Sequence, residues 1–183
     1  PKIWDRAIRH FAIDEGADLV VVHHPHIIQG IEIYNGKMIA HSLGNFIFDL
    51  NYPETYPSMI LNAEIDETGF SGFSITPLYI DDYLTIPVTG ELASYILDYI
   101  AMRSRELDTY VHVNLDQSKA YVIMDTLSMT SNDLEYQIWI SNWTETELFN
   151  GTYFMSKPHL IPGAGSLSEI STIFDHVTHY RLG

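Results

Sequence analysis

A short apolar run at residues 18–23 constrains the fold more than any other feature of the sequence. It follows a segment with helical spacing, residues 2–15, and Gly16, which stands where a helix C-cap is expected. Residues 19–22 are apolar on both faces, a pattern typical of a strand buried in the middle of an α/β sheet. We therefore predict an α/β fold, in which ligand sites gather at the carboxyl ends of strands.

The spacing also predicts which side of the first helix is buried. Apolar residues recur on one face of residues 2–15, and we expect this face to pack against the rest of the fold. The residues are Ile3, Trp4, Ala7, Ile8, Phe11 and Ala12.

Two hairpins and a second helix are predicted downstream. Asn35-Gly36 separates two alternating runs, which is the strongest short-range hairpin signal. A second hairpin is expected to turn at residues 66–69, again between alternating runs. Residues 89–107 have the pattern of a helix with Thr89 as its cap and an apolar stripe on one side.

The character of the chain changes near residue 108, where Ser, Thr, Asn and Tyr become frequent. We therefore divide the chain into residues 1–107 and a smaller α+β region, residues 108–183. In this second region we expect strands at 120–124 and 136–143, and a last helix that begins near Ser166.

Composition excludes several classes of protein. The chain has 24 Asp and Glu against 9 Lys and Arg, for a net charge of -15, so its field repels nucleic acids and anionic bilayers. No apolar run is long enough to span a membrane. The chain has no cysteine, which excludes disulfides, zinc–thiolate sites and cysteine nucleophiles. This fits an extracytoplasmic protein without disulfides and is also compatible with a cytosolic one.

The motif that points to chemistry is His23-His24-Pro25-His26, at the carboxyl end of the predicted strand. On an extended backbone, residues two apart project to the same side, and Pro25 biases His24 toward that conformation. We therefore predict that His24 and His26 are paired ligands of a divalent transition metal. The alternative is a surface loop that happens to be rich in histidine.

A catalytic metal site needs a third protein ligand, and a two-metal site needs bridging carboxylates. Asp18 is more typical of a turn before a strand, and Glu32 is expected to face solvent from its hairpin. His41 ends the second hairpin strand, where it can face the same crevice as the His motif. Asn45 either contributes to the site or holds a tight turn after Gly44. The further candidates, none with diagnostic spacing, are Asp18, Glu32, His41 and Asp49.

Several segments occur in a fixed order along the first half of the chain. They are Gly-Ala-Asp-Leu-Val-Val at 16–21, His-His-Pro-His at 23–26, Glu-Ile-Tyr at 32–34 and Ser-Leu-Gly-Asn-Phe-Ile-Phe-Asp at 42–49. In this order they resemble the C-terminal part of the CapA family, bacterial capsule-synthesis proteins linked to poly-γ-glutamate. The resemblance continues more weakly to about Leu107.

The CapA family in turn resembles the calcineurin-like metallophosphoesterases, which are layered αββα sandwiches with a two-metal centre on loops at strand ends. The resemblance implies that residues 1–107 form the C-terminal part of such a sandwich. It implies that His24 and His26 are metal ligands, with His23, His41 and Asn45 as catalytic candidates. The complete domain would bind two ions of Mn, Fe or Zn.

The other motifs of the family lie upstream of the matched segments. We therefore expect the chain either to be part of a longer protein, whose missing N-terminal part would complete a metal-dependent hydrolase, or to have lost the front half of the enzyme. The resemblance also implies a bacterial protein that is secreted or at the cell surface, and that meets an anionic polymer or cell-envelope components.

A hypothesis of another class is a non-catalytic assembly or polymer-binding module. Aromatic residues in the second region would then form an exposed binding face. The alternative is that they belong to an ordinary core. They are Tyr136, Trp139, Trp143, Tyr153 and Phe154.

Overall fold

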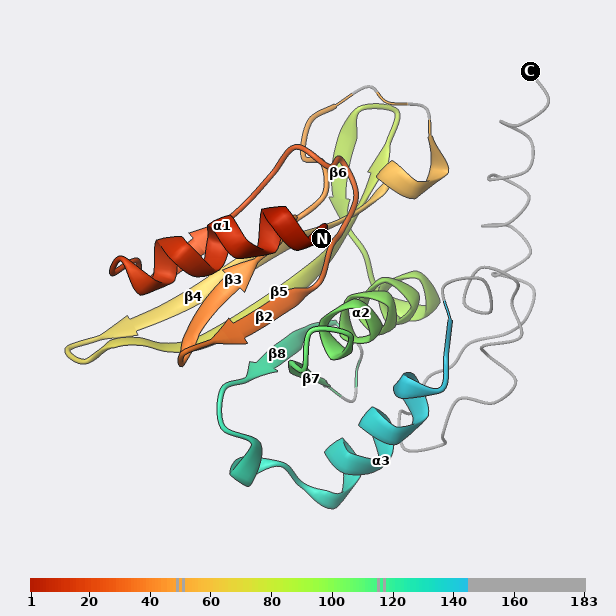
Figure 1. Cartoon of the computed structure of the whole chain (residues 1–183). Coiled ribbons are helices and arrows are strands. Elements are labelled where there is room, and N and C mark those ends of the chain that lie inside the picture. The colour runs from red at the N-terminus through yellow and green to blue at the C-terminus, as the bar shows by residue number, and fades with distance from the viewer. Residues whose placement is uncertain (49, 51, 115, 117, 145–183) are drawn as a thin grey trace.

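Two sheets and three α-helices form the computed structural model, which describes residues 1–48, 50, 52–114, 116 and 118–144 (Figure 1). One sheet has the strand order β1-β3-β2, and the other β4-β5-β8-β7, with β6 paired to β5. The fold is mixed α/β, consistent with the predicted sandwich. The elements are α1 (Ile3–Asp14), β1 (Leu19–Val21), β2 (Ile31–Tyr34), β3 (Lys37–Ala40), η1 (Pro53–Thr55), β4 (Pro57–Asp66), β5 (Gly69–Asp81), β6 (Leu84–Pro87), α2 (Gly90–Arg105), β7 (Tyr110–Val113), β8 (Ala120–Ile123), η2 (Thr126–Ser128) and α3 (Ser131–Ser141).

Both predicted hairpins are confirmed. β2 and β3 pair antiparallel across Asn35 and Gly36, and both turn residues have positive φ, as a two-residue hairpin turn requires. β4 and β5 form the second hairpin, which turns between Asp66 and Gly69.

β1 lies at the edge of the three-stranded sheet, so the prediction of a strand in the middle of a sheet is wrong. It pairs in parallel with β3, and within the described residues no strand pairs with its other side. Leu19 and Val20 are half-buried, and Val21 is 42% exposed. An apolar run indicates that both faces of a strand are buried. It does not indicate whether a neighbouring strand pairs with each of its two edges.

The helix predicted at residues 2–15 is confirmed as α1, but the predicted buried face is wrong. Arg9 and Ile13 are its buried residues, whereas the large apolar side chains of the predicted face are exposed. The reason lies in the sheet below, because antiparallel partners share a face and so do residues two apart. Glu32 and His41 therefore project together toward α1, and they need polar partners.

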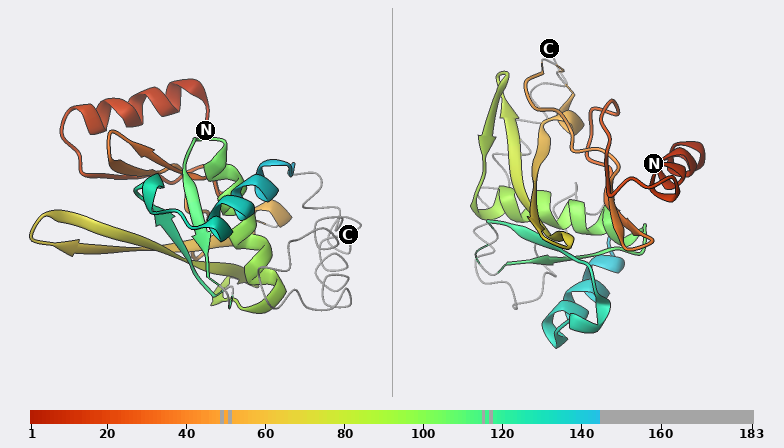
Figure 2. Two further views of the ribbon diagram at one scale, coloured as in Figure 1. Left: turned by 90° about the horizontal axis from the view of Figure 1, so that it is seen from below. Right: turned by 90° about the vertical axis from the view of Figure 1, so that its left-hand side faces the viewer.

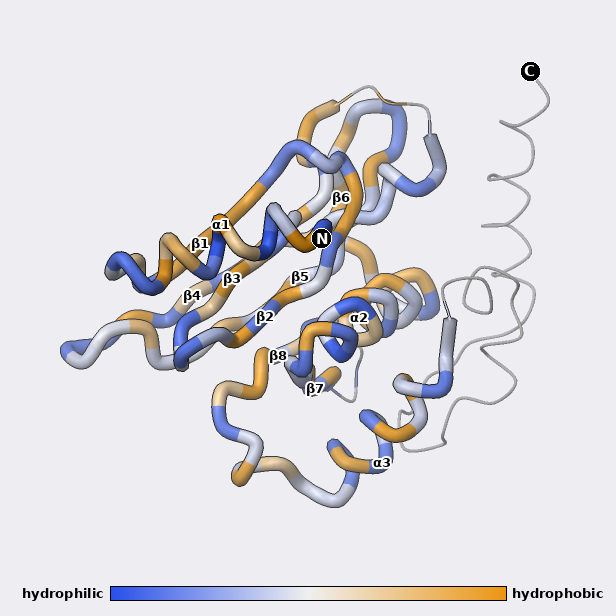
Figure 3. Tube along the Cα trace, in the orientation of Figure 1, coloured by the Kyte–Doolittle hydropathy of each residue, from blue (hydrophilic) through white to orange (hydrophobic). Residues whose placement is uncertain are grey.

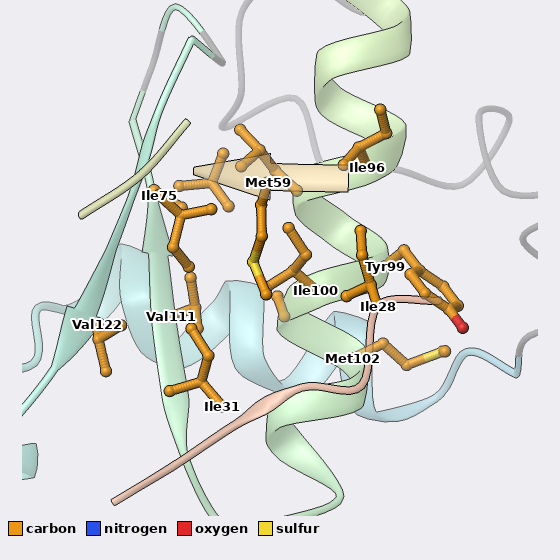
Figure 4. Packing of buried hydrophobic residues seen from close by; sticks show 14 of the residues in the cluster. Ile28, Ile31, Met59, Ile75, Ile96, Tyr99, Ile100, Met102, Val111 and Val122 are labelled. Atoms are coloured by element: carbon orange, nitrogen blue, oxygen red, sulfur yellow. The ribbon is translucent and has the colours of Figure 1, made fainter. Parts of the chain in front are cut away.

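One hydrophobic core joins the two sheets through α2 (Figure 4). α2 contacts β2 of the first sheet and both β5 and β7 of the second. Ile96 and Ile100 on α2 are fully buried, as is Ile31 on β2. The apolar stripe predicted for residues 89–107 is therefore confirmed, and Thr89 is the N-cap residue of α2.

The second region begins with two strands and ends, in its described part, with a helix. β8 confirms the strand predicted at 120–124 and pairs with β5, so residues on either side of position 107 share one sheet. The division of the chain at 107 stays a prediction.

The strand predicted at 136–143 is wrong, because most of these residues belong to α3. A capping box between Thr130 and Asp133 starts α3, and Tyr136, Gln137 and Ile140 are buried on one of its sides. The predicted helix near Ser166 lies outside the described residues. No helix in the described part of the chain has the length and apolar character needed to cross a membrane.

Candidate functional site

The His23–His26 loop leaves β1 at its carboxyl end, as predicted, but it is not extended. β1 and β2 lie on opposite sides of β3 and run antiparallel to each other, so residues 22–30 must reverse direction. His24 has φ 98° and His26 has φ 63°, which are positive values that residues with a side chain rarely adopt. The expectation of an extended His-Pro-His segment is therefore wrong. Strained backbone of this kind concentrates at functional sites.

The rings of His24 and His26 are placed close enough to share an ion. Their centroids lie 6.0 Å apart and their planes are tilted by 51°. A metal–nitrogen distance of about 2.0–2.1 Å puts each ring centroid about 3.2 Å from an ion, so two ligands of one ion have centroids no more than about 6.4 Å apart. His23 and His24 are exposed, and His26 is half-buried.

Asn45 fixes which nitrogen of His26 can bind a metal. The Nδ1 atom of His26 lies 2.8 Å from the Oδ1 atom of Asn45. Because a carboxamide oxygen only accepts, Nδ1 carries the proton, and the lone pair of His26 is on Nε2. Carbonyl groups that orient ligand histidines in this way are typical of metal sites.

Asn45 is itself held in place by β4. It is buried, and its backbone carbonyl accepts a hydrogen bond from the hydroxyl of Ser58. Gly44 has φ 86°, and a Cβ atom there would lie 3.0 Å from the carbonyl oxygen of Pro57. The tight turn therefore requires a glycine at position 44. Because the turn does not use the side chain of Asn45, that side chain can form its hydrogen bond with His26.

The sequence reasoning missed Phe48, which packs against His26 with ring centroids 4.7 Å apart. The adjacent residues Phe46 and Ile47 are exposed, and the hydroxyl of Thr85 on β6 bonds to the carbonyl of Phe46. An apolar rim therefore borders the His motif. The run of apolar residues in Phe46-Ile47-Phe48 was the available signal.

A second cluster of polar side chains lies under α1, where Glu32 was expected to face solvent. That expectation is wrong, because Glu32 is only 2% exposed. Its carboxylate accepts hydrogen bonds from two residues of α1, from Arg6 through Nε and Nη2, the shortest at 2.6 Å, and from His10 at 2.7 Å. α1 covers the face of the hairpin that would otherwise meet water. The spacing of Arg6, Arg9 and His10 on one side of the helix was the missed signal.

His41 is fully buried within the same cluster. The guanidinium of Arg9 only donates, so the Nδ1 atom of His41, 2.5 Å from Nη1 of Arg9, accepts that hydrogen bond. The Nε2 atom of His41 therefore carries the proton and donates to Glu32 at 2.8 Å. Both ring nitrogens are engaged, so His41 belongs to the network under α1. Its catalytic role stays a prediction.

The network shifts the pKa values of its members in directions that keep Glu32 charged and His41 neutral. Burial by itself raises the pKa of Glu32, but hydrogen bonds from His41, Arg6 and His10 outweigh it and lower the pKa to about 2. Burial lowers the pKa of His41, and the nearby charge of Arg9 lowers it further, although the bond to Glu32 opposes both. Removing one of these donors would leave the buried charge of Glu32 less compensated, which is unfavourable.

The remaining candidate ligands do not complete a metal site in the described part of the chain. Asp18 is exposed and forms an ion pair with Lys37 at 2.5 Å. Asp49 lies outside the described residues. Residues 1–48, 50, 52–114, 116 and 118–144 contain no group of three or more His, Cys, Asp or Glu side chains placed to hold a metal ion. The described residues thus bring two imidazoles together, and the role of His24 and His26 as metal ligands stays a prediction.

The aromatic residues of the second region belong to the core where they are described. Tyr136 is buried, and its hydroxyl bonds to Asp98 of α2. Trp139 and Trp143 are partly buried against the hydrophobic core. Tyr153 and Phe154 lie outside the described residues.

Comparison with known proteins places these features in one family segment. Residues 1–50, which include α1, the His motif, Glu32, His41 and Asn45, match the family model "Bacterial capsule synthesis protein PGA_cap". The chain is 38% identical over 88 residues to the PGA biosynthesis protein CapA of Bacillus subtilis, which covers 48% of this chain and 23% of that protein.

Two further relatives match at a similar level. The capsule biosynthesis protein CapA of Bacillus anthracis is 34% identical over 92 residues, covering 50% of this chain and 22% of that protein. The uncharacterized protein y4sH of Sinorhizobium fredii is 34% identical over 106 residues, covering 47% of this chain and 23% of that protein. The chain thus spans less than a quarter of the length of these relatives. Over the segment that it shares with them, the chain is similar to the CapA proteins of bacterial capsule synthesis.

Proposed function

We propose that this chain contributes a two-histidine metal-binding loop to a capsule biosynthesis protein that acts as a metal-dependent hydrolase. The observation that carries the proposal is the bond between His26 Nδ1 and Asn45 Oδ1, which leaves Nε2 of His26 as a ligand beside the ring of His24. Further ligands, among them bridging carboxylates, would come from the rest of the protein.

The metal would be Mn, Fe or Zn, because imidazole suits these ions. When bound, such an ion polarises a phosphoryl or amide oxygen and lowers the pKa of a bound water. His24 and His26 hold it, and Asn45 keeps His26 in the ligand tautomer. Phe48 packs against the His26 ring, and the exposed His23 is the proposed proton donor or acceptor.

An anionic polymer such as poly-γ-glutamate is the proposed substrate or partner, in line with the PGA in the printed name of the Bacillus subtilis relative. A chain with net charge -15 repels such a polymer, so bound cations would have to offset that charge at the site. A role in capsule synthesis supports placement outside the cytoplasm, where the absence of cysteine is no disadvantage.

The test is the metal content of the full-length protein, measured by elemental analysis after dialysis. We expect about one to two transition-metal ions per molecule, and His24→Ala or His26→Ala should lower that number. His112→Ala is the matched control. His112 lies on β7, far in sequence from the His motif, and its partly exposed side chain pairs with Asp133. A metal-free full-length protein, or equal metal content in His26→Ala and His112→Ala, would overturn the proposal.

A further inference from the structure

Three consecutive apolar residues beside the His motif have exposed side chains. Phe46 is 59% exposed, Ile47 is 72% exposed and Phe48 is 43% exposed, and we call these three residues the apolar rim. Figure 3 shows the rim as a hydrophobic stretch of the chain next to β6. Figure 1 and the right-hand view of Figure 2 place it at the same end of the molecule as the loop that follows β1. Contiguous exposed apolar side chains of this kind mark binding sites.

The backbone of the apolar rim is held by two neighbouring elements. On β4, the hydroxyl of Ser58 donates a hydrogen bond to the carbonyl of Asn45, just before the rim. On β6, the hydroxyl of Thr85 donates a hydrogen bond to the carbonyl of Phe46, within the rim. The exposed side chains therefore stand on a fixed backbone. A surface that is ordered before its ligand arrives loses less conformational entropy on binding.

The apolar rim is in direct contact with the histidine pair. The ring centroid of Phe48 lies 4.7 Å from that of His26, which in turn lies 6.0 Å from that of His24. A ligand whose polar group is held at the two histidines therefore has its adjacent part next to the rim. This part of the ligand meets apolar side chains.

The charges of the segment that carries the rim disfavour an anionic chain as the group bound there. Residues 38–102 contain no Lys or Arg, whereas Asp and Glu recur along them. The cationic residues that flank this segment are engaged in ion pairs, Lys37 with Asp18 and Arg103 with Glu106. An apolar group needs no cationic partner, and its burial against the rim is favourable by itself.

We propose that the apolar rim binds an alkyl or aryl group of the substrate, so that the substrate of the proposed hydrolase is an amphiphile. Its polar head group lies at His24 and His26, and the attached apolar group lies on Phe46 and Ile47. The inference rests on the proposed function for the position of the head group. The contact between the apolar group and the rim does not require a metal ion.

Two phosphate esters that differ only in their alkyl chain test the inference. The binding of n-octyl phosphate and of methyl phosphate to the full-length protein is measured by isothermal titration calorimetry. Because both probes carry the same head group, the ratio of their dissociation constants reports on the alkyl chain alone. We expect n-octyl phosphate to bind at least about tenfold more tightly, a factor that the burial of two methylene groups already supplies.

Two isoleucines provide matched variants for this measurement. Ile47 in the apolar rim and Ile65 near the β4–β5 turn are 72% and 70% exposed, so neither change removes a buried side chain. Ile47→Ser should lower the ratio about threefold or more, and Ile65→Ser should leave it unchanged. Phe46→Ser should act like Ile47→Ser, since it keeps the carbonyl that bonds to Thr85. The affinity for methyl phosphate should stay the same in all three variants.

Equal affinity of the wild-type protein for the two probes would overturn the inference, as expected if another part of the full-length protein covers the rim. Equal ratios in Ile47→Ser and Ile65→Ser would overturn it as well. The metal content of the same samples separates the two proposals. A preference for the octyl chain in a protein without bound metal contradicts only the proposed function. A metal-loaded protein without that preference contradicts only the present inference.

Discussion

α1 and α2 are both amphipathic helices that lie on sheets, yet they bury opposite sides. α2 turns its apolar side inward, where Ile96, Leu97 and Ile100 are fully buried between the two sheets. α1 turns its polar side inward, where Arg9 is buried, while Trp4 is 82% exposed. The difference shows that amphipathic spacing identifies two faces of a helix but does not decide which of them the fold covers.

The chemistry of the sheet surface under each helix determines which face of the helix is buried. β2 and β3 present apolar side chains toward α2, with Ile31 and Met38 both fully buried. On their other face the same strands present Glu32 and His41, so the helix on that side must supply donors. The energetics of the two interfaces should differ accordingly, because one rests on apolar burial and the other on charge-assisted hydrogen bonds.

The largest effect is expected at the α2 interface. Ile100→Ala should lower the free energy of unfolding of the 183-residue chain by about 2–5 kcal/mol, because it removes buried methyl groups and leaves a cavity. Urea denaturation followed by circular dichroism measures the change. Ile138→Ala on α3, where the side chain is 65% exposed, is the control and should have little effect. Equal losses in the two variants would contradict the assignment of α2 to the core.

The next effect is expected at the polar interface of α1. Glu32→Gln should lower the free energy of unfolding at pH 7 by about 2 kcal/mol, because hydrogen bonds to a charged group are lost. Urea denaturation is again the measurement. Glu67→Gln, at an exposed position in the β4–β5 turn, should have no comparable effect.

This loss should also depend on pH. The pKa of Glu32 is about 2 in the folded chain against an ordinary 4.5, so on acidification the unfolded chain takes up this proton first. The stability due to Glu32 is thus complete above about pH 4.5 and is lost as the pH falls toward 2. The folded pKa of His41 is also below its ordinary 6.5, so its contribution too falls on acidification, starting near that pH. A gap between wild type and Glu32→Gln that stays constant from pH 7 to pH 3 would refute this account.

A smaller effect separates two helix N-termini. The side chain of Thr130 accepts a hydrogen bond within the capping box of α3, whereas Thr89, the N-cap residue of α2, has no side-chain cap bond. Thr130→Ala should therefore cost about 1 kcal/mol, and Thr89→Ala should cost less. Thermal unfolding of both variants measures the difference, and the reverse order would argue against the capping box.

The smallest effect is expected on the outer side of α1. Trp4→Ala should change the free energy of unfolding of the 183-residue chain by no more than about 0.5 kcal/mol, as for other surface positions. The contrast with Ile100→Ala sharpens the comparison of the two helices, since both changes remove a large apolar side chain. A loss above about 1 kcal/mol would mean that some part of this chain covers Trp4.

Part of the fold and of the candidate site could be predicted because its signals are local. Asn35-Gly36 sets its hairpin through turn geometry, and the spacing in residues 89–107 marks α2 and its buried stripe. The His motif was placed correctly at the carboxyl end of β1. The backbone conformation of the motif was predicted wrongly. The chain reverses between β1 and β2 because β1 pairs in parallel and β2 antiparallel with β3, and the sequence does not indicate this pairing.

The error at α3 has a different origin. Residues 136–143 are rich in aromatic and β-branched residues, which favour a strand. The buried side of α3 includes the polar residues Asp133 and Gln137, so its helical period does not stand out as apolar. The spacing of Thr130 and Asp133 at the start of the helix was the signal that pointed the other way.

The sequence by itself determined the elements whose signals lie within a few residues: the two hairpins, α1, α2, and a histidine loop at the end of β1. Only the tertiary structure decided which face of α1 is buried, that Glu32 is charged and enclosed, and which nitrogens of His26 and His41 carry protons. The physical reason is that these properties depend on partners far away in the chain, such as Arg6 for Glu32, Arg9 for His41 and Asn45 for His26. The burial and protonation state of such a side chain are therefore set by its partner, and the partner is known only once the chain has folded.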